Sequence, residues 1–252
     1  MQAIILAGGF GTRLKSVTGD IIKPMAPIAG RPFLAWLLDY MAEQGVREVL
    51  LCLHHKAEQI THHFGSAYGG MTLRYLIEER ALGTGGALMQ AMKVLKPTQP
   101  VFAMNGDSLV RLNYRQMLMQ HLASGRNITL ATAPMPDCRR YSQLHIRDEL
   151  VHGYELYGDE MAGDISVGFY VLSPDIFSDM YGDQTETIAH KTRQGFAEST
   201  LSFERDFLAP NVPHLLPAAF SQVDYFIDIG VPQDYARAQL EVPNLLRQPL
   251  AA

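Results

Sequence analysis

The segment AIILAGGFGTRL, residues 3–14, decides the fold. It begins with an entirely apolar run from Ala3 to Leu6, and glycines at positions 8 and 9 end that run. A short apolar run without polar alternation is typical of a strand that is buried on both faces, as in the middle of a parallel sheet. We therefore expect a central strand that leads directly into a glycine-rich loop.

Outward from this strand, apolar strands and amphipathic helices alternate through about residue 133. The expected strands are 48–53, 71–79, 101–107 and 127–132, and the expected helices are 32–45, 57–64 and 81–95. This alternation predicts an α/β fold, with a Rossmann-like open, mainly parallel mixed sheet and helices on both faces. Ligands bind beyond the carboxyl ends of the strands in such sheets.

The alternation of strands and helices ends at about residue 141. The segments 141–146, 149–156 and 164–172 predict strands with little helix between them, either added antiparallel to the same sheet or forming a cap over the site. One more strand at 220–230 and a closing helix at 231–241 follow. We expect a single domain over residues 1–242 and a loose C-terminal tail over 243–252.

Composition narrows the function class. The chain has 252 residues and a formal net charge of -5 at pH 7, which disfavours a broad basic surface for nucleic acid. Its two cysteines, Cys52 and Cys138, form no CxxC pair, as expected in a reducing compartment. No apolar run approaches the length of a membrane span. We expect a soluble cytoplasmic protein, with the oligomeric state open and a homo-oligomer included.

The loop after the first strand has the chemistry of a phosphate site. Glycines at 8, 9 and 11 let backbone N–H groups approach a phosphate, while Arg13 and Lys23 supply positive charge. The P-loop string GxxxxGK[ST] does not occur, and Leu14 occupies the third glycine position of the dinucleotide fingerprint. The alternative is a tight turn with solvated surface charges.

Two aspartates each follow an apolar run and are candidates for a metal site. Asp107 ends VFAMNGD, and Asp228 lies in DYFIDIG. Mg²⁺ prefers one or two carboxylates together with phosphate oxygens and water, so the two acids could hold one Mg²⁺ between them. The alternative for each acid alone is a helix cap or a turn.

The combination LAGGFGTRL…KPM resembles the signature of the sugar-1-phosphate nucleotidyltransferases, and the likeness covers about residues 1–240. The resemblance implies the nucleotide-diphospho-sugar transferase fold, a requirement for Mg²⁺ and two substrates, a nucleoside triphosphate and a sugar 1-phosphate. It implies catalytic roles for Arg13, Lys23 and Asp107, and metal binding by Asp107 and Asp228. The implied nucleotide contacts are Leu6, Ala7, Gly8, Gly9, Gly11, Thr12, Arg13, Lys23, Glu79, Gly83, Thr84 and Asp107. This chain has Ile22 where the family usually has proline before the lysine.

The segment EERALGTGGAL resembles the part of the family that packs against the nucleobase. Glu78 or Glu79 could accept hydrogen bonds from guanine, and we choose Glu79 because it is closer to the glycine turn. The alternative is a helix start that Thr84 caps. The implied sugar-phosphate contacts are Gly106, Glu155, Ser166, Gly168 and Glu204.

The chain departs from the family on the sugar side. Leu156 stands in place of a lysine and Ser166 in place of an asparagine. Another cation must therefore meet the sugar phosphate, and the sequence does not choose among four candidates by charge: Arg139, Arg140, Lys191 and Arg193.

Within the family the chain is most similar to the heptose 1-phosphate guanylyltransferases, through SFERD and FIDIGVPQDY. That likeness implies transfer of GMP from GTP to D-glycero-α-D-manno-heptose 1-phosphate, giving GDP-heptose and pyrophosphate. The alternatives are a hexose 1-phosphate (mannose or glucose) nucleotidyltransferase and a catalytically silent subunit that senses nucleotide sugars. An NAD-dependent oxidoreductase is disfavoured by the broken fingerprint.

Overall fold

The computed structural model describes residues 1–9, 14, 19–159, 161–177 and 200–248. The strands are β1 (Gln2–Leu6), β2 (Pro27–Ile28), β3 (Arg31–Pro32), β4 (Glu48–Leu53), β5 (Ala67–Tyr68), β6 (Met71–Ile77), β7 (Val101–Asn105), β8 (Ser108–Leu112), β9 (Ile128–Met135), β10 (Gln143–Arg147), β11 (Leu150–Glu155), β12 (Gly163–Leu172), β13 (Ala218–Phe220) and β14 (Val223–Asp228). The helices are the short η2 (Lys23–Met25), α2 (Phe33–Glu43), α3 (Ala57–Phe64), α4 (Gly83–Leu95), α5 (Tyr114–Ser124), the π-helix η4 (Phe203–Leu208), α8 (Ala209–Leu215) and α9 (Pro232–Leu245).

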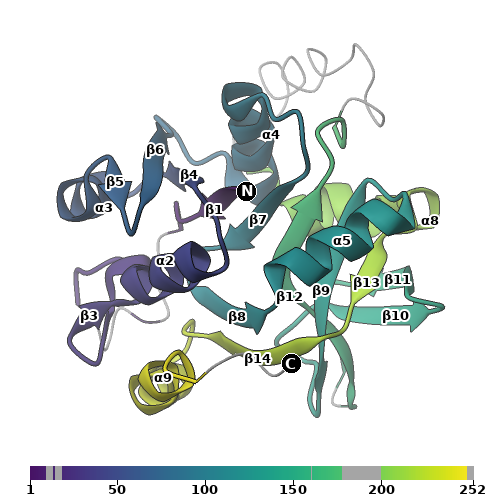
Figure 1. Cartoon of the computed structure of the whole chain (residues 1–252). Coiled ribbons are helices and arrows are strands. Elements are labelled where there is room, and N and C mark those ends of the chain that lie inside the picture. The colour runs from purple at the N-terminus through teal and green to yellow at the C-terminus, as the bar shows by residue number, and fades with distance from the viewer. Residues whose placement is uncertain (10–13, 15–18, 160, 178–199, 249–252) are drawn as a thin grey trace.

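A ten-stranded mixed sheet forms the centre of the molecule, in the order β10-β11-β13-β9-β12-β7-β1-β4-β6-β5 (Figure 1). The strand β1 pairs in parallel with both β4 and β7, and β4 pairs in parallel with β6. Beyond β7 the direction changes, because β12 runs antiparallel to β7 and to β9. The expected mixed α/β sheet, with antiparallel strands added by the second half of the chain, is confirmed.

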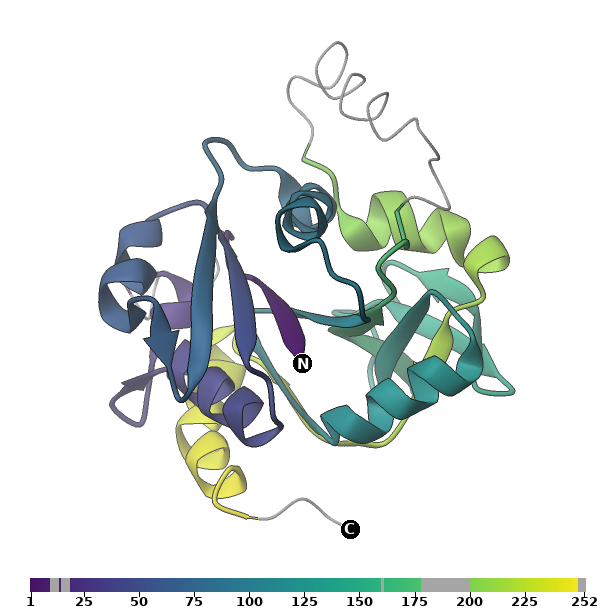
Figure 2. The same ribbon diagram turned by 45° about the horizontal axis from the view of Figure 1, so that its top comes forward.

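Helices cover both faces of this sheet, as Figure 2 shows. Alternate residues of β1 point to opposite faces: Ala3 and Ile5 pack with α2, α3 and α5, while Ile4 packs with α4, η4 and α8. All three residues are fully buried, which explains why the run from Ala3 to Leu6 is apolar throughout. The helix α4 lies beside η4, and η4 leads into α8 on the same face of the sheet (Figure 2).

A smaller unit packs beside β9 and β12 of the main sheet. The strands β8 and β14 pair antiparallel in a sheet of their own, and α9 packs against β14 and β2. The strand β8 was not expected from the sequence. It immediately follows the turn at Gly106-Asp107, and its residues are all buried. The polar residue Asn113 then caps α5 by accepting a hydrogen bond from the Gln116 N–H at 3.0 Å.

The expected loose tail over 243–252 is corrected in part. The helix α9 continues to Leu245, and Leu245 and Leu246 pack against the cluster between α9 and the β8–β14 pair. The carbonyl oxygen of Gln248 accepts a hydrogen bond from Arg111 Nη2 at 2.7 Å. Residues 249–252 lie outside the described residues.

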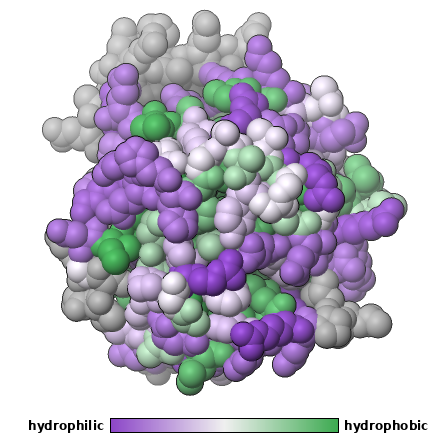
Figure 3. Space-filling model, turned by 60° about the vertical axis from the view of Figure 1, so that its left-hand side comes forward, coloured by the Kyte–Doolittle hydropathy of each residue, from purple (hydrophilic) through white to green (hydrophobic). Residues whose placement is uncertain are grey.

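No helix in the described ranges is both long and apolar enough to cross a membrane. On the face that carries α2 and α3, hydrophobic residues occur as small separate groups among hydrophilic ones (Figure 3).

A buried histidine links α5 to the sheet and makes stability depend on pH. His121 is 2% exposed, its Nδ1 lies 2.9 Å from Thr129 Oγ1, and its Nε2 lies 3.1 Å from Ser173 Oγ. Burial lowers the pKa of this ring from 6.5 to about 4. The unfolded chain therefore takes up a proton at a higher pH than the folded chain does. Stability should fall as the pH drops below 6.5, until the ring is protonated in both states.

We expect the His121 contribution to the free energy of unfolding to drop by about 2 kcal/mol between pH 7 and pH 5. Urea unfolding of the wild type and of His121→Gln at both pH values measures it. The variant should lose that part of the pH dependence, whereas His152→Gln, at an exposed histidine, should keep it. Equal pH dependence in all three proteins would contradict the assignment to His121.

Candidate active site

A first cavity lies where β1, β4, β6 and β7 end. The Ala7 N–H donates to the Cys52 carbonyl, and the Gly106 N–H donates to the Leu6 carbonyl. These bonds join β1 to β4 and to β7 at the edge of the cavity. The cavity has a volume of about 450 Å³. Its described lining residues are Leu6, Ala7, Gly8, Gly9, Lys23, Pro24, Cys52, Glu78, Ala81, Gly83, Thr84, Ala87, Asn105, Asp107 and Thr200.

Two glycines of the first loop differ in their surroundings. A Cβ placed on Gly8 would lie 3.4 Å from the Cβ of His54, so the backbone there is packed against β4. A Cβ on Gly9 would meet no described atom within 4 Å, so this backbone is open to a ligand. Gly11, Thr12 and Arg13 lie outside the described residues, and their phosphate contacts stay predictions.

Lys23 extends from η2 to the cavity. Its Nζ donates to Asp107 Oδ2 at 2.9 Å, and the two side chains are 18% and 32% exposed. Pro24 is buried in η2 and fixes the backbone next to the lysine. Ile22, the residue that departs from the family pattern, is 3% exposed and belongs to the core beside α2. The departure therefore adds apolar packing and leaves the position of Lys23 intact.

Asp228 lies beside Asp107, although the two aspartates are 121 positions apart in the sequence. In the β8–β14 pair Asp228 stands opposite Ser108, and the Ile229 N–H donates to the Asp107 carbonyl at 3.1 Å. The Gly230 N–H donates to Asp228 Oδ1 at 2.7 Å. Only Asp107 follows a strand of the main sheet, because Asp228 ends β14 in the separate β8–β14 sheet.

Three charged side chains, those of Lys23, Asp107 and Asp228, lie close together beside Gly230. A Cβ on Gly230 would lie 2.9 and 3.0 Å from the two carboxylate oxygens of Asp228 and 3.1 Å from Lys23 Nζ, so only glycine leaves room for them. Burial raises the pKa of the Asp228 carboxyl and the negative charge of Asp107 raises it further, while Lys23 lowers it. A cation bound between the two carboxylates would relieve this repulsion.

A second cavity, of about 260 Å³, opens on the other side of Asp228. Thr84 and Asn105 line both cavities, which are therefore neighbours. Its described lining residues are Thr84, Asn105, Ser108, Arg140, Tyr141, Ser142, Tyr154, Ser166, Val167, Gly168, Tyr170, Glu204, Phe226 and Asp228. Three residues predicted for the sugar phosphate, Ser166, Gly168 and Glu204, are among them.

Two hydroxyl groups belong to the wall of this second cavity, those of Tyr154 and Ser166. Burial raises the pKa of the Tyr154 hydroxyl to about 12, while its side-chain hydrogen bonds with Ser142 and Ser166 oppose that rise. Gly168 has a φ of +70°, and a Cβ there would lie 2.3 Å from Asn105 Nδ2, so glycine is required at this position.

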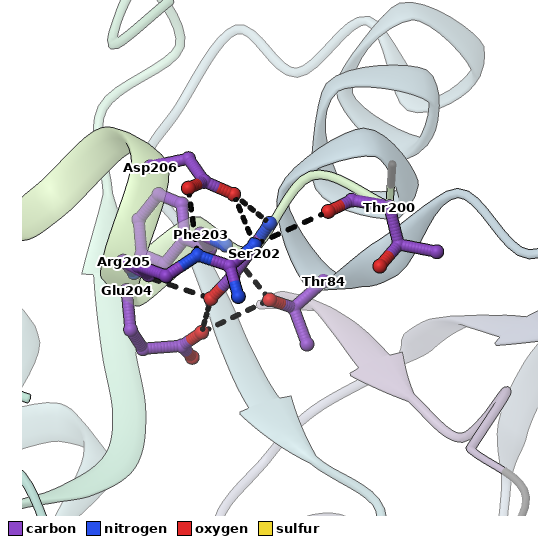
Figure 4. Close-up of polar contacts among 7 residues, drawn as sticks. All are labelled: Thr84, Thr200, Ser202, Phe203, Glu204, Arg205 and Asp206. Atoms are coloured by element: carbon purple, nitrogen blue, oxygen red, sulfur yellow. Dashed lines mark hydrogen bonds and ion pairs between the residues drawn. The ribbon is translucent and has the colours of Figure 1, made fainter. Parts of the chain in front are cut away.

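Glu204 is held in place by a hydrogen-bond network that joins α4 to η4 (Figure 4). Its Oε2 accepts from Thr84 Oγ1 at 2.9 Å and from Ser202 Oγ at 3.1 Å, and its Oε1 accepts from Tyr170 OH at 3.3 Å. Thr84 Oγ1 in turn accepts from the Phe203 N–H at 2.8 Å (Figure 4). Thr84 thus connects two segments and does not cap α4, contrary to the alternative considered from the sequence.

The glycines at the start of α4 have a structural reason that the sequence analysis missed. Gly83 has a φ of +77°, and a Cβ on it would lie 2.4 Å from the Leu201 carbonyl oxygen. The Gly85 N–H donates to that same oxygen at 2.8 Å. These glycines let the segment before η4 approach α4, in addition to lining the cavity at Gly83.

The structure places the two candidate glutamates differently. Glu78 is 9% exposed and lines the first cavity, where its Oε2 accepts from the Leu82 N–H at 2.9 Å. Burial raises the pKa of its carboxyl, while the hydrogen bond from Leu82 opposes that rise. Glu79 is exposed and does not belong to the described cavity wall. The alternation of side chains after β6 turns Glu78 inward and Glu79 outward.

Two residues predicted for the sugar phosphate, Glu155 and Gly106, lie outside the described lining of both cavities. Glu155 is exposed and pairs with His145, with Oε1 2.7 Å from Nε2, and it is absent from the described lining of both cavities. Its neighbour Tyr154 faces the second cavity instead. Gly106 is buried, and a Cβ there would lie 2.9 Å from the Cβ of Ala7. The glycine therefore allows β1 and β7 to approach closely, which is a packing role.

Of the four cations that the sequence left open, Arg140 lines the second cavity. Arg139 is exposed and binds Asp137, with Nη2 close to Oδ2. Lys191 and Arg193 lie outside the described residues.

Three polar residues of the second cavity were not predicted from the sequence: Asn105, Ser108 and Tyr154. Each is a polar side chain within or at the end of an apolar strand, and that pattern could have identified them.

Known proteins resemble this chain over nearly its whole length. The profile of the family described as nucleotidyl transferase matches residues 2–244. The D-glycero-α-D-manno-heptose 1-phosphate guanylyltransferase of Aneurinibacillus thermoaerophilus is 37% identical over 247 residues, which cover 98% of this chain and 100% of the relative. The protein of the same name from Campylobacter jejuni is 38% identical over 237 residues, covering 93% and 97%. The crystal structure of HddC from Yersinia pseudotuberculosis complexed with GMP-PN has a TM-score of 0.76 at 35% identity, covering 94% of this chain and 97% of that chain.

Proposed function

Because the chain belongs to the nucleotidyl transferase family, we propose that it transfers GMP from GTP to D-glycero-α-D-manno-heptose 1-phosphate. The products are GDP-heptose and pyrophosphate. The observation that carries the proposal is the cluster of Lys23, Asp107 and Asp228 at the junction of two cavities. The guanine and heptose assignments draw on the relatives with those names.

The two cavities divide the substrates between them. The nucleotide occupies the first cavity, with its phosphates over the backbone of Gly8 and Gly9 and beside Lys23. The sugar occupies the second cavity and directs its phosphate toward Asp228. An oxygen of the sugar phosphate then attacks the α-phosphorus of the nucleotide, and pyrophosphate leaves. This oxygen is already ionised, so the residues position and neutralise charge and need no general base.

Asp107 and Asp228 fit a site for Mg²⁺. They are adjacent carboxylates at the boundary of the cavities, and the repulsion between them favours a bound cation. The described residues contain no cluster of three or more metal-ligating side chains, so phosphate oxygens and water would supply the other ligands. Bound Mg²⁺ would neutralise part of the negative charge on the phosphates of both substrates. Lys23, paired with Asp107, holds that carboxylate in position.

Glu78 is the residue we assign to guanine. Guanine presents two neighbouring donors, N1–H and its exocyclic amine, whereas adenine presents an acceptor at N1. Glu78 lies in the wall of the first cavity with one oxygen bonded to the Leu82 N–H. A carboxylate facing adenine N1 would be left unpaired, which costs about 1–3 kcal/mol or more in a site shielded from water.

The test of the proposed function is a panel of GTP, ATP, CTP, UTP and dTTP against heptose, mannose and glucose 1-phosphates, measured by pyrophosphate release. GTP with D-glycero-α-D-manno-heptose 1-phosphate should give the highest kcat/KM. A hexose 1-phosphate that exceeds the heptose would replace the sugar assignment. No pyrophosphate from any pair would support a nucleotide-sugar sensor instead.

Asp107→Asn and Asp228→Asn should each lower kcat by about 100-fold or more at limiting Mg²⁺, because each removes one anionic ligand and keeps the side-chain shape. The measurement is kcat as a function of Mg²⁺ concentration. Asp224→Asn, at an exposed residue of the same strand as Asp228, is the control and should match the wild type. Near-normal turnover by either site variant at limiting Mg²⁺ would refute the paired-carboxylate site.

Glu78→Gln should reduce the preference for GTP over ATP by about 10-fold or more, through loss of the carboxylate acceptor. Glu79→Gln is the matched control, because Glu79 is the next residue and its side chain is exposed. The ratio of kcat/KM values for the two nucleotides measures the preference. If both variants keep the wild-type ratio, backbone groups select the base and Glu78 does not.

A further inference from the structure

The second cavity combines an acidic wall with a single described cation. Glu204 and Asp228 contribute two carboxylates, and Arg140 is the one lysine or arginine within the described lining. An anionic group that enters this cavity is repelled by the acids unless a cation meets it. A neutral polyol has no such difficulty, because hydroxyl groups donate to carboxylates. The charge pattern therefore separates the cavity into a part for hydroxyl groups and a part for an anion beside Arg140.

Arg140 is held by a buried acid. Its Nη1 donates to Asp234 Oδ2 at 2.9 Å, and Asp234 is only 8% exposed in the first turn of α9. The other oxygen of Asp234 accepts from Arg237 Nη1 at 3.0 Å. The guanidinium carbon of Arg140 also lies 5.4 Å from the ring centre of Tyr141. This anchoring fixes the direction of a long side chain that is otherwise 46% exposed.

The bond to Asp234 uses one nitrogen of the guanidinium group. A guanidinium carries five N–H donors in a rigid fork, so Arg140 retains donors for a second partner. Phosphate oxygens match this fork in geometry and charge. Lys23 is placed differently, because its Nζ binds Asp107 and the residue lines the first cavity.

We propose that Arg140 binds the phosphate group of the sugar 1-phosphate and that Asp234 is the positioning residue that orients it. This inference rests on the proposed function and assigns one step of it, the capture of the acceptor phosphate. Arg140 lines the same cavity as Asp228, so a phosphate bound by the arginine lies on the acceptor side of the paired aspartates. Glu204, in the wall of the same cavity, remains for the sugar hydroxyl groups.

A purely structural role for Arg140 makes a different prediction. If the pair with Asp234 only fastens the loop before β10 to α9, its loss should lower thermal stability and affect both substrates alike. If Arg140 binds the acceptor phosphate, its loss should weaken one substrate selectively. The KM values for the two substrates therefore distinguish the roles.

The experiment compares Arg140→Gln with Arg139→Gln, its exposed neighbour bound to Asp137. With D-glycero-α-D-manno-heptose 1-phosphate and mannose 1-phosphate as probes, Arg140→Gln should raise the KM for the sugar 1-phosphate by about 10- to 100-fold. Its KM for GTP should change less than about twofold, and Arg139→Gln should match the wild type. Asp234→Asn should raise the same KM by a smaller factor, and Arg140→Lys should recover part of the loss.

Direct titration of each sugar 1-phosphate into the proteins gives a readout that does not need turnover. Weaker binding by Arg140→Gln, with a melting curve like that of the wild type, supports the proposal. An active wild type whose Arg140→Gln variant keeps its KM, or loses affinity equally for both substrates, overturns the role of Arg140 alone. A wild type that neither turns over nor binds any sugar 1-phosphate overturns the proposed function as well.

Discussion

The ion pair between Lys23 and Asp107 is the interaction on which the site depends. It joins the first loop to the end of β7 and leaves both side chains partly shielded from water. Asp228 adds a second negative charge from the β8–β14 pair, so the three side chains together carry a net charge of about -1. Shielded charges of this kind attract each other more strongly than exposed ones, and an unbalanced acid among them favours a cation. The cluster therefore joins distant segments and carries the unbalanced negative charge on which the proposed metal site rests.

The fold followed from the sequence wherever burial alone determines residue type. The run from Ala3 to Leu6 is apolar because both faces of β1 are covered, and the same reasoning located β4, β7 and β12. Pairing between distant segments could not be predicted in this way. Nothing local in Ser108–Leu112 shows that it pairs with β14, so the meeting of Asp107 and Asp228 required the structure. The end of α9 was placed too early, because packing by Leu245 and Leu246 extends it.

Less of the site than of the fold could be predicted from the sequence, and the differences have physical causes. Proximity in sequence favoured Glu79, yet side-chain alternation placed Glu78 in the cavity. Gly83 lines the first cavity, yet neighbouring atoms give a separate packing reason for glycine there and at Gly106, because a Cβ would strike Leu201 and Ala7. Residue type alone could not separate Arg139 from Arg140; the buried partner Asp234 is what directs one of them to the cavity. Sequence patterns identify groups that suit a phosphate, whereas the direction of each group depends on contacts across the chain.

The bond between Thr84 and Glu204 has a consequence for changing the substrate range of this enzyme. Thr84 belongs to the walls of both cavities, and Glu204 belongs to the wall of the second. Replacing Glu204 to admit a different sugar would leave the Thr84 hydroxyl without its acceptor and loosen the joint between α4 and η4. The first cavity would then change shape, although no residue that lines it alone had been altered. The shapes of the two cavities are therefore coupled through this bond, and redesign of the second cavity would need Thr84 and Glu204 to be changed as a pair.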